Sequence, residues 1–135
     1  MIKKYEGELG IFEYDDADFE IKKLVNTYYA CYIGKETDGS KIKIPKGIKV
    51  CHHMFAGCEN LETPPVIPKG VENCRCMFAR CENLITTPKI PDGVKNCEHM
   101  FNGCYNLKTA PDIPEGVKNC SGMFWNCYGL ETAPE

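Results

Sequence analysis

The chain has 135 residues and a formal net charge of −3, from 16 basic and 19 acidic residues. This length corresponds to a single domain that can bury a core. No basic run is present that could neutralise several phosphates, so direct nucleic-acid binding is disfavoured. No apolar stretch approaches the ~18 residues that a membrane span requires, so we expect no contact with a membrane.

Ten cysteines occur in a chain whose N-terminus, MIKKYEGELGIFEYDD, does not look like an export signal. A signal peptide has an apolar core after its basic residues, and this segment lacks one. We therefore expect a cytoplasmic protein with free thiols, because disulfides are rare in reducing compartments. Disulfides are the alternative if the chain is exported by another route.

Residues 1–43 share no repeat with the rest of the chain and predict a β-rich capping segment. A strand is expected over 8–14, and a helix over 19–29 after an acidic capping residue. The β-forming residues 28–34, an Asp-Gly turn and the extended residues 41–45 then indicate a hairpin. This segment would cover the open first coil of the array that follows.

The remainder of the chain divides into four units of 23 residues. Each unit opens Ile-Pro-x-Gly-(Val/Ile), continues Cys-x-x-Met-Phe-x-x-Cys and then reads Leu-x-Thr or a close variant. A fixed period of this length is the mark of a repeat architecture. The units span 44–66, 67–89, 90–112 and 113–135.

The pattern within one unit predicts a turn, a helical segment and a short strand. Pro-x-Gly favours a tight turn, because proline presets one φ and glycine tolerates a positive one. Cys51, Met54, Phe55 and Cys58 fall at i, i+3, i+4 and i+7, the spacing of one face of a short helix. Leu61 opens an extended run that would stack in parallel on its equivalents.

The four units resemble the leucine-rich repeats of the BspA type, a family of bacterial surface proteins. The matching segments are IPKGIKVCHHMFAGCENL, IPKGVENCRCMFARCENL, IPDGVKNCEHMFNGCYNL and IPEGVKNCSGMFWNCYGL, and the resemblance covers residues 44–135. It implies a short curved solenoid used for protein recognition. Many relatives are secreted or attached to cells, which this N-terminus does not suggest.

We therefore predict an α/β fold: a short right-handed leucine-rich-repeat-like solenoid of four coils, with a β-rich N-terminal cap over residues 1–43. The invariant cysteines, methionines, phenylalanines and leucines would face inward. The positions that vary between units would face outward.

The variable outward positions are where a partner-binding surface would be expected on a repeat protein. Arg75 and Glu98 occupy one such column. Tyr105, Trp125 and Tyr128 place three large aromatic side chains in the last two units, and exposed aromatics often anchor protein interfaces. The alternatives are neutral variation of a solvated surface and, for the aromatics, cover of the last coil.

A second column suggests a metal site. His53, Cys76 and His99 occupy the same position in three successive units, and thiolate and imidazole are ligands that Zn²⁺ prefers. His52 or a water molecule would be the fourth ligand. The paired spacing of a zinc finger is missing, and the alternative is three unrelated surface residues.

No enzymatic activity is expected, because no nucleophile elbow, phosphate-binding glycine loop or paired-carboxylate cleft occurs. We predict a non-catalytic module that binds a protein partner. One form is a small stoichiometric inhibitor, such as a phage or mobile-element protein that blocks a host defence nuclease of the CRISPR effector kind. The alternatives are a fragment or stand-alone form of a cell-surface adhesin and a zinc-stabilised structural module.

The sequence ends at Thr132–Glu135 without a capping segment, so we expect the last coil to offer apolar surface and a strand edge. A homodimer formed through this coil would cover both.

Overall fold

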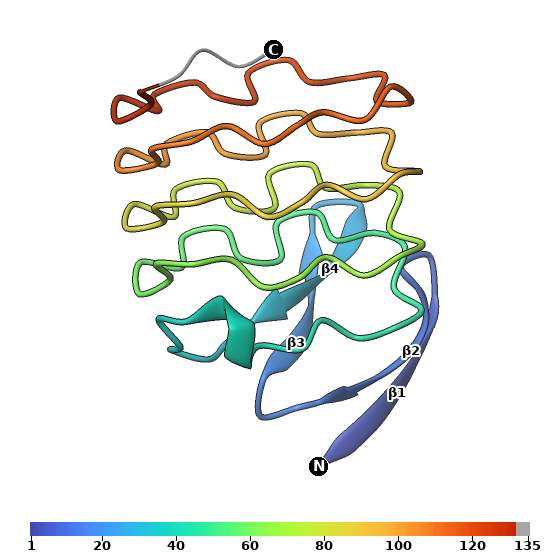
Figure 1. Ribbon diagram of the computed structural model, residues 1–135. Helices are drawn as coiled ribbons and strands as arrows, with labels where there is room; N and C mark the ends of the chain where they lie inside the picture. The colour runs from blue at the N-terminus through green and yellow to red at the C-terminus, as the bar shows by residue number, and fades with distance from the viewer. Residues whose placement is uncertain (132–135) are drawn as a thin grey trace.

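The computed structural model describes residues 1–131, which begin with two β-hairpins (Figure 1). In the first hairpin, β1 (Ile2–Gly7) pairs antiparallel with β2 (Gly10–Asp15). In the second, β3 (Phe19–Leu24) pairs antiparallel with β4 (Thr27–Tyr32). The two sheets have two strands each and do not join. A 3₁₀ helix, η1 (Gly39–Lys41), leads into the repeats.

The predicted helix over 19–29 is wrong, because these residues form β3, a turn and the start of β4. Six residue pairs join the two strands, from Phe19 with Tyr32 to Leu24 with Thr27. The rings of Phe19 and Tyr32 lie 5.6 Å apart and are both buried, so the hairpin is held by its tertiary contacts. The strand over 2–7 was not predicted, and the hairpin expected between 28–34 and 41–45 is wrong, because β4 pairs with β3 and residues 39–41 form η1.

The predicted α/β leucine-rich-repeat solenoid is also wrong. Residues 1–131 contain no α-helix, and all of their named strands belong to the two N-terminal antiparallel hairpins. Residues 44–131 consist of turns and extended segments, joined from one unit to the next by single parallel bridges such as Asn73 with Asn96. Among residues 1–131, no helix has the length and apolar character needed to cross a membrane.

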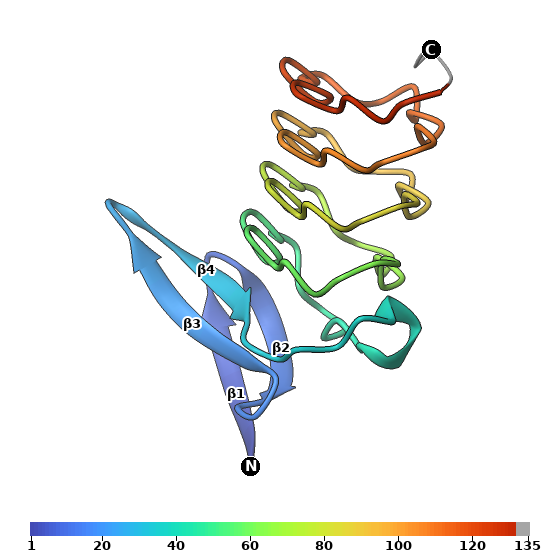
Figure 2. The same cartoon turned by 90° about the vertical axis from the view of Figure 1, so that its left-hand side faces the viewer.

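The four repeat units nevertheless lie side by side as stacked coils (Figures 1 and 2). In each coil the Cys-x-x-Met-Phe-x-x-Cys segment forms two consecutive β-turns, and we call this segment the turn ribbon. In the first coil, the amide of Met54 donates to the carbonyl of Cys51 at 3.2 Å, and that of Cys58 to Phe55 at 3.0 Å. His53 has a φ of 59° and Gly57 a φ of 75°. A positive φ at the third residue only is the mark of a type II turn.

Four other amides of the ribbon, at its first, third, fifth and seventh residues, bind the next coil. The amide of Cys51 donates to the carbonyl of Asn73 at 2.8 Å, and that of Phe55 donates to Met77 at 2.9 Å. The third and seventh ribbon residues donate in the same direction, and the pattern recurs at all three junctions. The ribbon therefore presents N–H groups to the coil that follows and carbonyl groups to the coil that precedes it.

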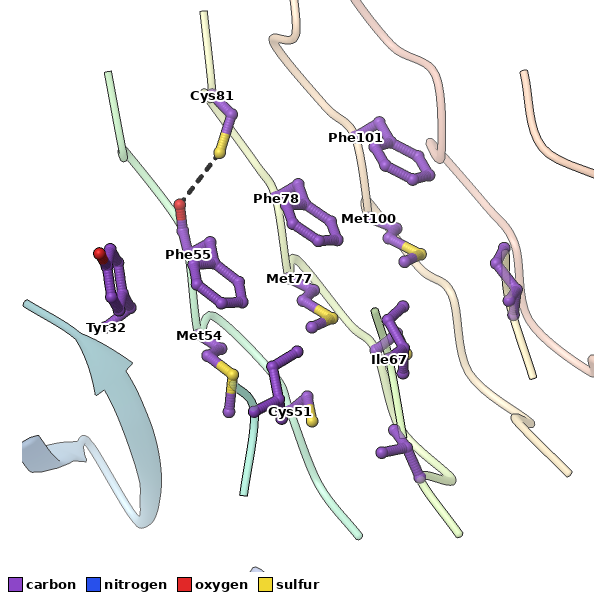
Figure 3. Close-up of a cluster of buried hydrophobic side chains, with 14 of the residues drawn as sticks. Tyr32, Cys51, Met54, Phe55, Ile67, Met77, Phe78, Cys81, Met100 and Phe101 are labelled. Carbon is purple, nitrogen blue, oxygen red and sulfur yellow. Dashed lines mark hydrogen bonds between the residues drawn. The ribbon is translucent and has the colours of Figure 1, made fainter. Parts of the chain in front are cut away.

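Most of the invariant side chains fill the space inside the coils (Figure 3), but the predicted inward position of Cys120 in the fourth coil is wrong, because this residue is exposed. Phe55, Phe78 and Phe101 stack with ring centroids 5.4 and 5.6 Å apart and nearly parallel planes. A row of methionines lies beside them. The thiol of Cys81 donates to the carbonyl of Phe55 at 3.1 Å, so this buried polar atom has a partner.

Residues of the N-terminal segment cover the first coil. The amide of Tyr32 donates to the carbonyl of Met54 at 2.9 Å, and its ring lies 5.3 Å from that of Phe55. On the other side, the amide of Lys49 donates to the carbonyl of Leu9 at 2.7 Å. The aromatic column of the stack is thus continued by an aromatic residue from a hairpin.

The turn ribbon predicts opposite effects of glycine at two adjacent positions. Arg80 has a φ of 60° at a position where the neighbouring coils have Gly57 and Gly103, whereas the φ of Ala79 is negative. Arg80→Gly should stabilise the fold by up to about 1 kcal/mol by relieving the left-handed conformation. Ala79→Gly should destabilise it by about 0.5–1 kcal/mol. Urea unfolding measures both, and equal signs would contradict the two-turn geometry.

Candidate binding surface

The outward side chains of the four turn ribbons, with the two residues that follow each ribbon, form one face of the stack. We call it the turn face, and in the first coil it comprises outward residues within 51–60. In the first three coils the first and last residues of the type II turns are buried or partly buried, so the two central residues point away from the coil interior. This geometry places Arg75, Glu98 and Trp125 in columns on the same face, and Tyr128 adjoins them through its hydrogen bond to Asn126.

The aromatic residues predicted to bind a partner are exposed and lie in contact with other side chains. Tyr105 and Tyr128 stack with centroids 5.6 Å apart and planes 3° apart, and their exposed fractions are 42% and 76%. Trp125 is 61% exposed and lies against the ring of His99, with centroids 5.0 Å apart. We call these four residues the aromatic patch.

The patch is held together by polar contacts at its centre. The hydroxyl of Tyr128 donates to the side-chain oxygen of Asn126 at 2.9 Å. The amide nitrogen of the same side chain lies 3.4 Å from the side-chain oxygen of Asn102 in the preceding coil. Because Asn126 follows Trp125 directly, the two most exposed rings flank one asparagine. These contacts restrict the rotamers of the patch before any partner arrives, which lowers the entropy cost of binding.

Arg75 and Glu98 bind each other across adjacent coils. The Nε atom of Arg75 lies 2.7 Å from Oε1 of Glu98, and Asn119 donates to Oε2 of Glu98 at 3.0 Å. The hydrogen bond from the Arg75 guanidinium, followed by that from Asn119, lowers the pKa of the Glu98 carboxyl. The two predicted contact residues are therefore an ion pair beside the patch rather than two free charges.

The predicted zinc ligands lie in one column but in different surroundings. His53, Cys76 and His99 are the third residues of their ribbons, with φ of 59°, 54° and 53°. The ring of His53 contacts that of His52, with Nδ1 atoms 3.3 Å apart, whereas His99 contacts Trp125. Among residues 1–131, no three His, Cys, Asp or Glu side chains form a group that could hold a metal ion.

The pKa shifts at this column act in opposite directions on metal binding, since a lowered histidine pKa favours the neutral imidazole that binds a metal and a raised cysteine pKa disfavours the thiolate. Burial, then the charges of His52 and Arg75, lower the pKa of His53. Burial likewise raises the pKa of Cys76, although Arg75 opposes the shift. A cysteine binds zinc as the thiolate, so a metal at Cys76 would have to displace a proton that burial favours. The zinc site stays a prediction from the sequence.

The cysteines that open and close the turn ribbons of the first three coils are structural, because burial keeps their thiols protonated. All ten thiols are free, and burial raises the pKa of Cys51 and of Cys104 to about 12. Such thiols are protonated at neutral pH, and the thiol is a far weaker nucleophile than the thiolate. The thiols of Cys81, Cys104 and Cys127 donate weak hydrogen bonds to the carbonyls of Phe55, Phe78 and Phe101, whereas Cys120 is exposed.

An open edge at this end of the stack was expected from the sequence, but not that its outward backbone groups are all donors. In the fourth coil, the outward-directed ribbon amides are those of Cys120, Gly122, Phe124 and Asn126, and we call them the amide row. None of them has an acceptor among residues 1–131. The residue types at Gly122 and Asn126 were a signal in the sequence, because glycine and asparagine tolerate the positive φ that a type II turn requires. Their φ values are 64° and 62°. The expectation of an uncapped end at Thr132–Glu135 lies outside the described residues.

Comparison of this chain with family models, with curated proteins and with solved structures found no match. The resemblance of residues 44–135 to the BspA-type repeats therefore stays a prediction.

Proposed function

We propose that this protein is a binding module that recognises another protein through the aromatic patch. The observation that supports the proposal is the exposure of Trp125 and Tyr128, two large rings whose neighbours already hold them in place. Tryptophan and tyrosine dominate the residues that contribute most to protein interfaces. Both rings lie on the fourth coil, which packs on the core of the stack through the buried Met123 and the partly buried Phe124.

The charge around the patch agrees with this proposal. Residues 119–130, NCSGMFWNCYGL, contain no charged side chain. Arg75 and Glu98, the two charged residues predicted to contact a partner, bind each other. Charged residues are depleted at the centre of protein interfaces and common at their rims. The patch and the ion pair have the arrangement of such a centre and rim.

Replacing both rings should remove partner binding without unfolding the chain. We expect Trp125→Ala with Tyr128→Ala to weaken binding by at least about 30-fold, since truncation of one such anchor typically costs about 2 kcal/mol or more. The measurement is quantitative mass spectrometry of proteins retained from cells that express the chain, followed by titration of the purified partner.

The matched control is Ile11→Ala, which removes a 70% exposed side chain from β2, away from the turn face. A partner retained by the wild type and by Ile11→Ala but lost by the double variant supports the proposal. Equal retention by all three proteins contradicts it. Circular dichroism of each variant checks that the substitution leaves the fold intact.

A further inference from the structure

The amide row makes the outer edge of the fourth coil a surface of hydrogen-bond donors. At each of the three junctions, the equivalent four amides donate to four carbonyls of the next coil. The carbonyls of the fourth ribbon point the other way, since those of Asn119, Ser121, Met123 and Trp125 accept from the third coil. The edge lies at the end of the stack farthest from the β1–β2 hairpin (Figures 1 and 2).

Neither a β-strand nor a second copy of the chain matches this edge. A strand edge presents amides as well as carbonyls, so its amides would face the amide row unpaired, at about 1–3 kcal/mol each. Two copies joined through their fourth coils would bring donors against donors. The carbonyl edge of the first coil is partly occupied in each copy by the N-terminal segment, since the amide of Tyr32 donates to the carbonyl of Met54.

A proline-rich segment matches the edge in both hydrogen bonding and shape. Proline carries a backbone carbonyl and no N–H, so it offers acceptors to the amide row without unpaired donors. Proline-rich segments are already extended when free, and they dock against exposed aromatic rings. Trp125 lies between Phe124 and Asn126, two residues of the amide row, and the Tyr128 hydroxyl binds the Asn126 side chain. The rings thus flank the donors.

We propose that the amide row and the aromatic patch together bind a proline-rich extended segment of the partner. This inference rests on the proposed function and specifies the chemistry of the segment that is recognised. The absence of charged side chains from 119–130 favours an uncharged segment. An acidic segment, whose carboxylates would also accept from the amides, is the alternative that the experiment separates.

Trp125 is the only tryptophan of the chain, so its fluorescence reports binding at the patch directly. The probes are decaproline, decaglutamate and a ten-residue Gly-Ser peptide, each acetylated and amidated. We expect a saturable change with decaproline at a Kd below about 1 mM. Tyr128→Ala should weaken it at least tenfold, whereas Tyr28→Ala, which removes an exposed tyrosine of β4, should leave it unchanged.

Backbone ¹H–¹⁵N spectra test the hydrogen bonds separately from the rings. On addition of decaproline, the amide protons of Cys120, Gly122, Phe124 and Asn126 should shift downfield. Those of Cys97 and Phe101, which already donate to the fourth coil, should not.

Three results would overturn the inference: no saturable signal with decaproline, tighter binding of decaglutamate, or shifts that spare the amide row. The proposed function is judged independently, by loss of the cellular partner in the double variant. A partner that depends on Trp125 and Tyr128 while decaproline fails to bind refutes the proline-rich segment alone.

Discussion

Under reducing conditions the chain should unfold as the pH rises from 9 to 12, because its core contains protonated thiols. Burial raises the pKa of Cys51 and of Cys104 from 9.0 to about 12 in the folded protein. A pKa raised by folding gives stability that is complete below pH 9 and is lost as the pH approaches the folded value. Each such thiol removes about 1.4 kcal/mol of unfolding free energy per pH unit in this range.

The expected loss is large compared with the stability of a domain. A thiol whose pKa is raised this far lowers the unfolding free energy by about 4 kcal/mol between pH 9 and pH 12. Domains are stable by only about 5–15 kcal/mol. Burial also raises the pKa of Cys97 to about 12 and those of Cys58 and Cys127 to about 11, so several groups act in the same direction.

Urea unfolding at pH 7, 9, 10 and 11 measures this dependence. Cys104→Ala should make the decline above pH 9 shallower by about 1.4 kcal/mol per pH unit, because one titrating group is gone. Leu84→Ala is the control, since it creates a cavity at an untitratable core position and should lower stability equally at every pH. An unfolding free energy that stays constant up to pH 11 would show that the thiols are not buried as described.

Truncating the middle of the phenylalanine column should have the largest effect of any single substitution at neutral pH. Phe78 is fully buried and stacks on Phe55 and Phe101, so Phe78→Ala removes contacts in three coils. We expect a loss of about 3–5 kcal/mol, the usual cost of a buried Phe→Ala change. In a stack where each coil contacts only its neighbours, this loss weakens two interfaces together.

The matched variant is Phe124→Ala in the fourth coil. Phe124 is half-buried and stacks on one ring only, at 5.9 Å, so its truncation should cost less than half as much. Urea unfolding followed by circular dichroism gives both values. If Phe78→Ala is too unstable to purify, Phe78→Leu should still cost more than Phe124→Leu. Equal costs at the two positions would contradict the stacked column.

Much of the candidate surface could be predicted from variation between the four units. Tyr105, Trp125 and Tyr128 depart from Glu and Ala at the same positions of earlier units, and the structure places all three on one exposed face. The contacts of these residues could not be predicted. The pairing of Arg75 with Glu98 and of Trp125 with His99 depends on which columns touch across a junction.

For the N-terminal segment, less could be predicted from the sequence and more was decided by tertiary contacts. Its β-forming residues at 28–32 were recognised, but residues 19–24 have a pattern that also suits a helix. The partner strand decided between the two, through six residue pairs that join β3 to β4. Short segments of mixed pattern take the structure that their tertiary contacts favour.

The sequence by itself determined the 23-residue period and the identity of the buried side chains, because a repeated apolar pattern can be satisfied only by stacking. Only the tertiary structure decided the conformation of the backbone within each unit. The spacing i, i+3, i+4 and i+7 directs Cys51, Met54, Phe55 and Cys58 to one side in two helical turns, and it does so equally in two type II turns. The hydrogen bonds that favour the type II turns over a helix join residues of adjacent coils. The sequence of a single unit therefore does not decide between these two conformations.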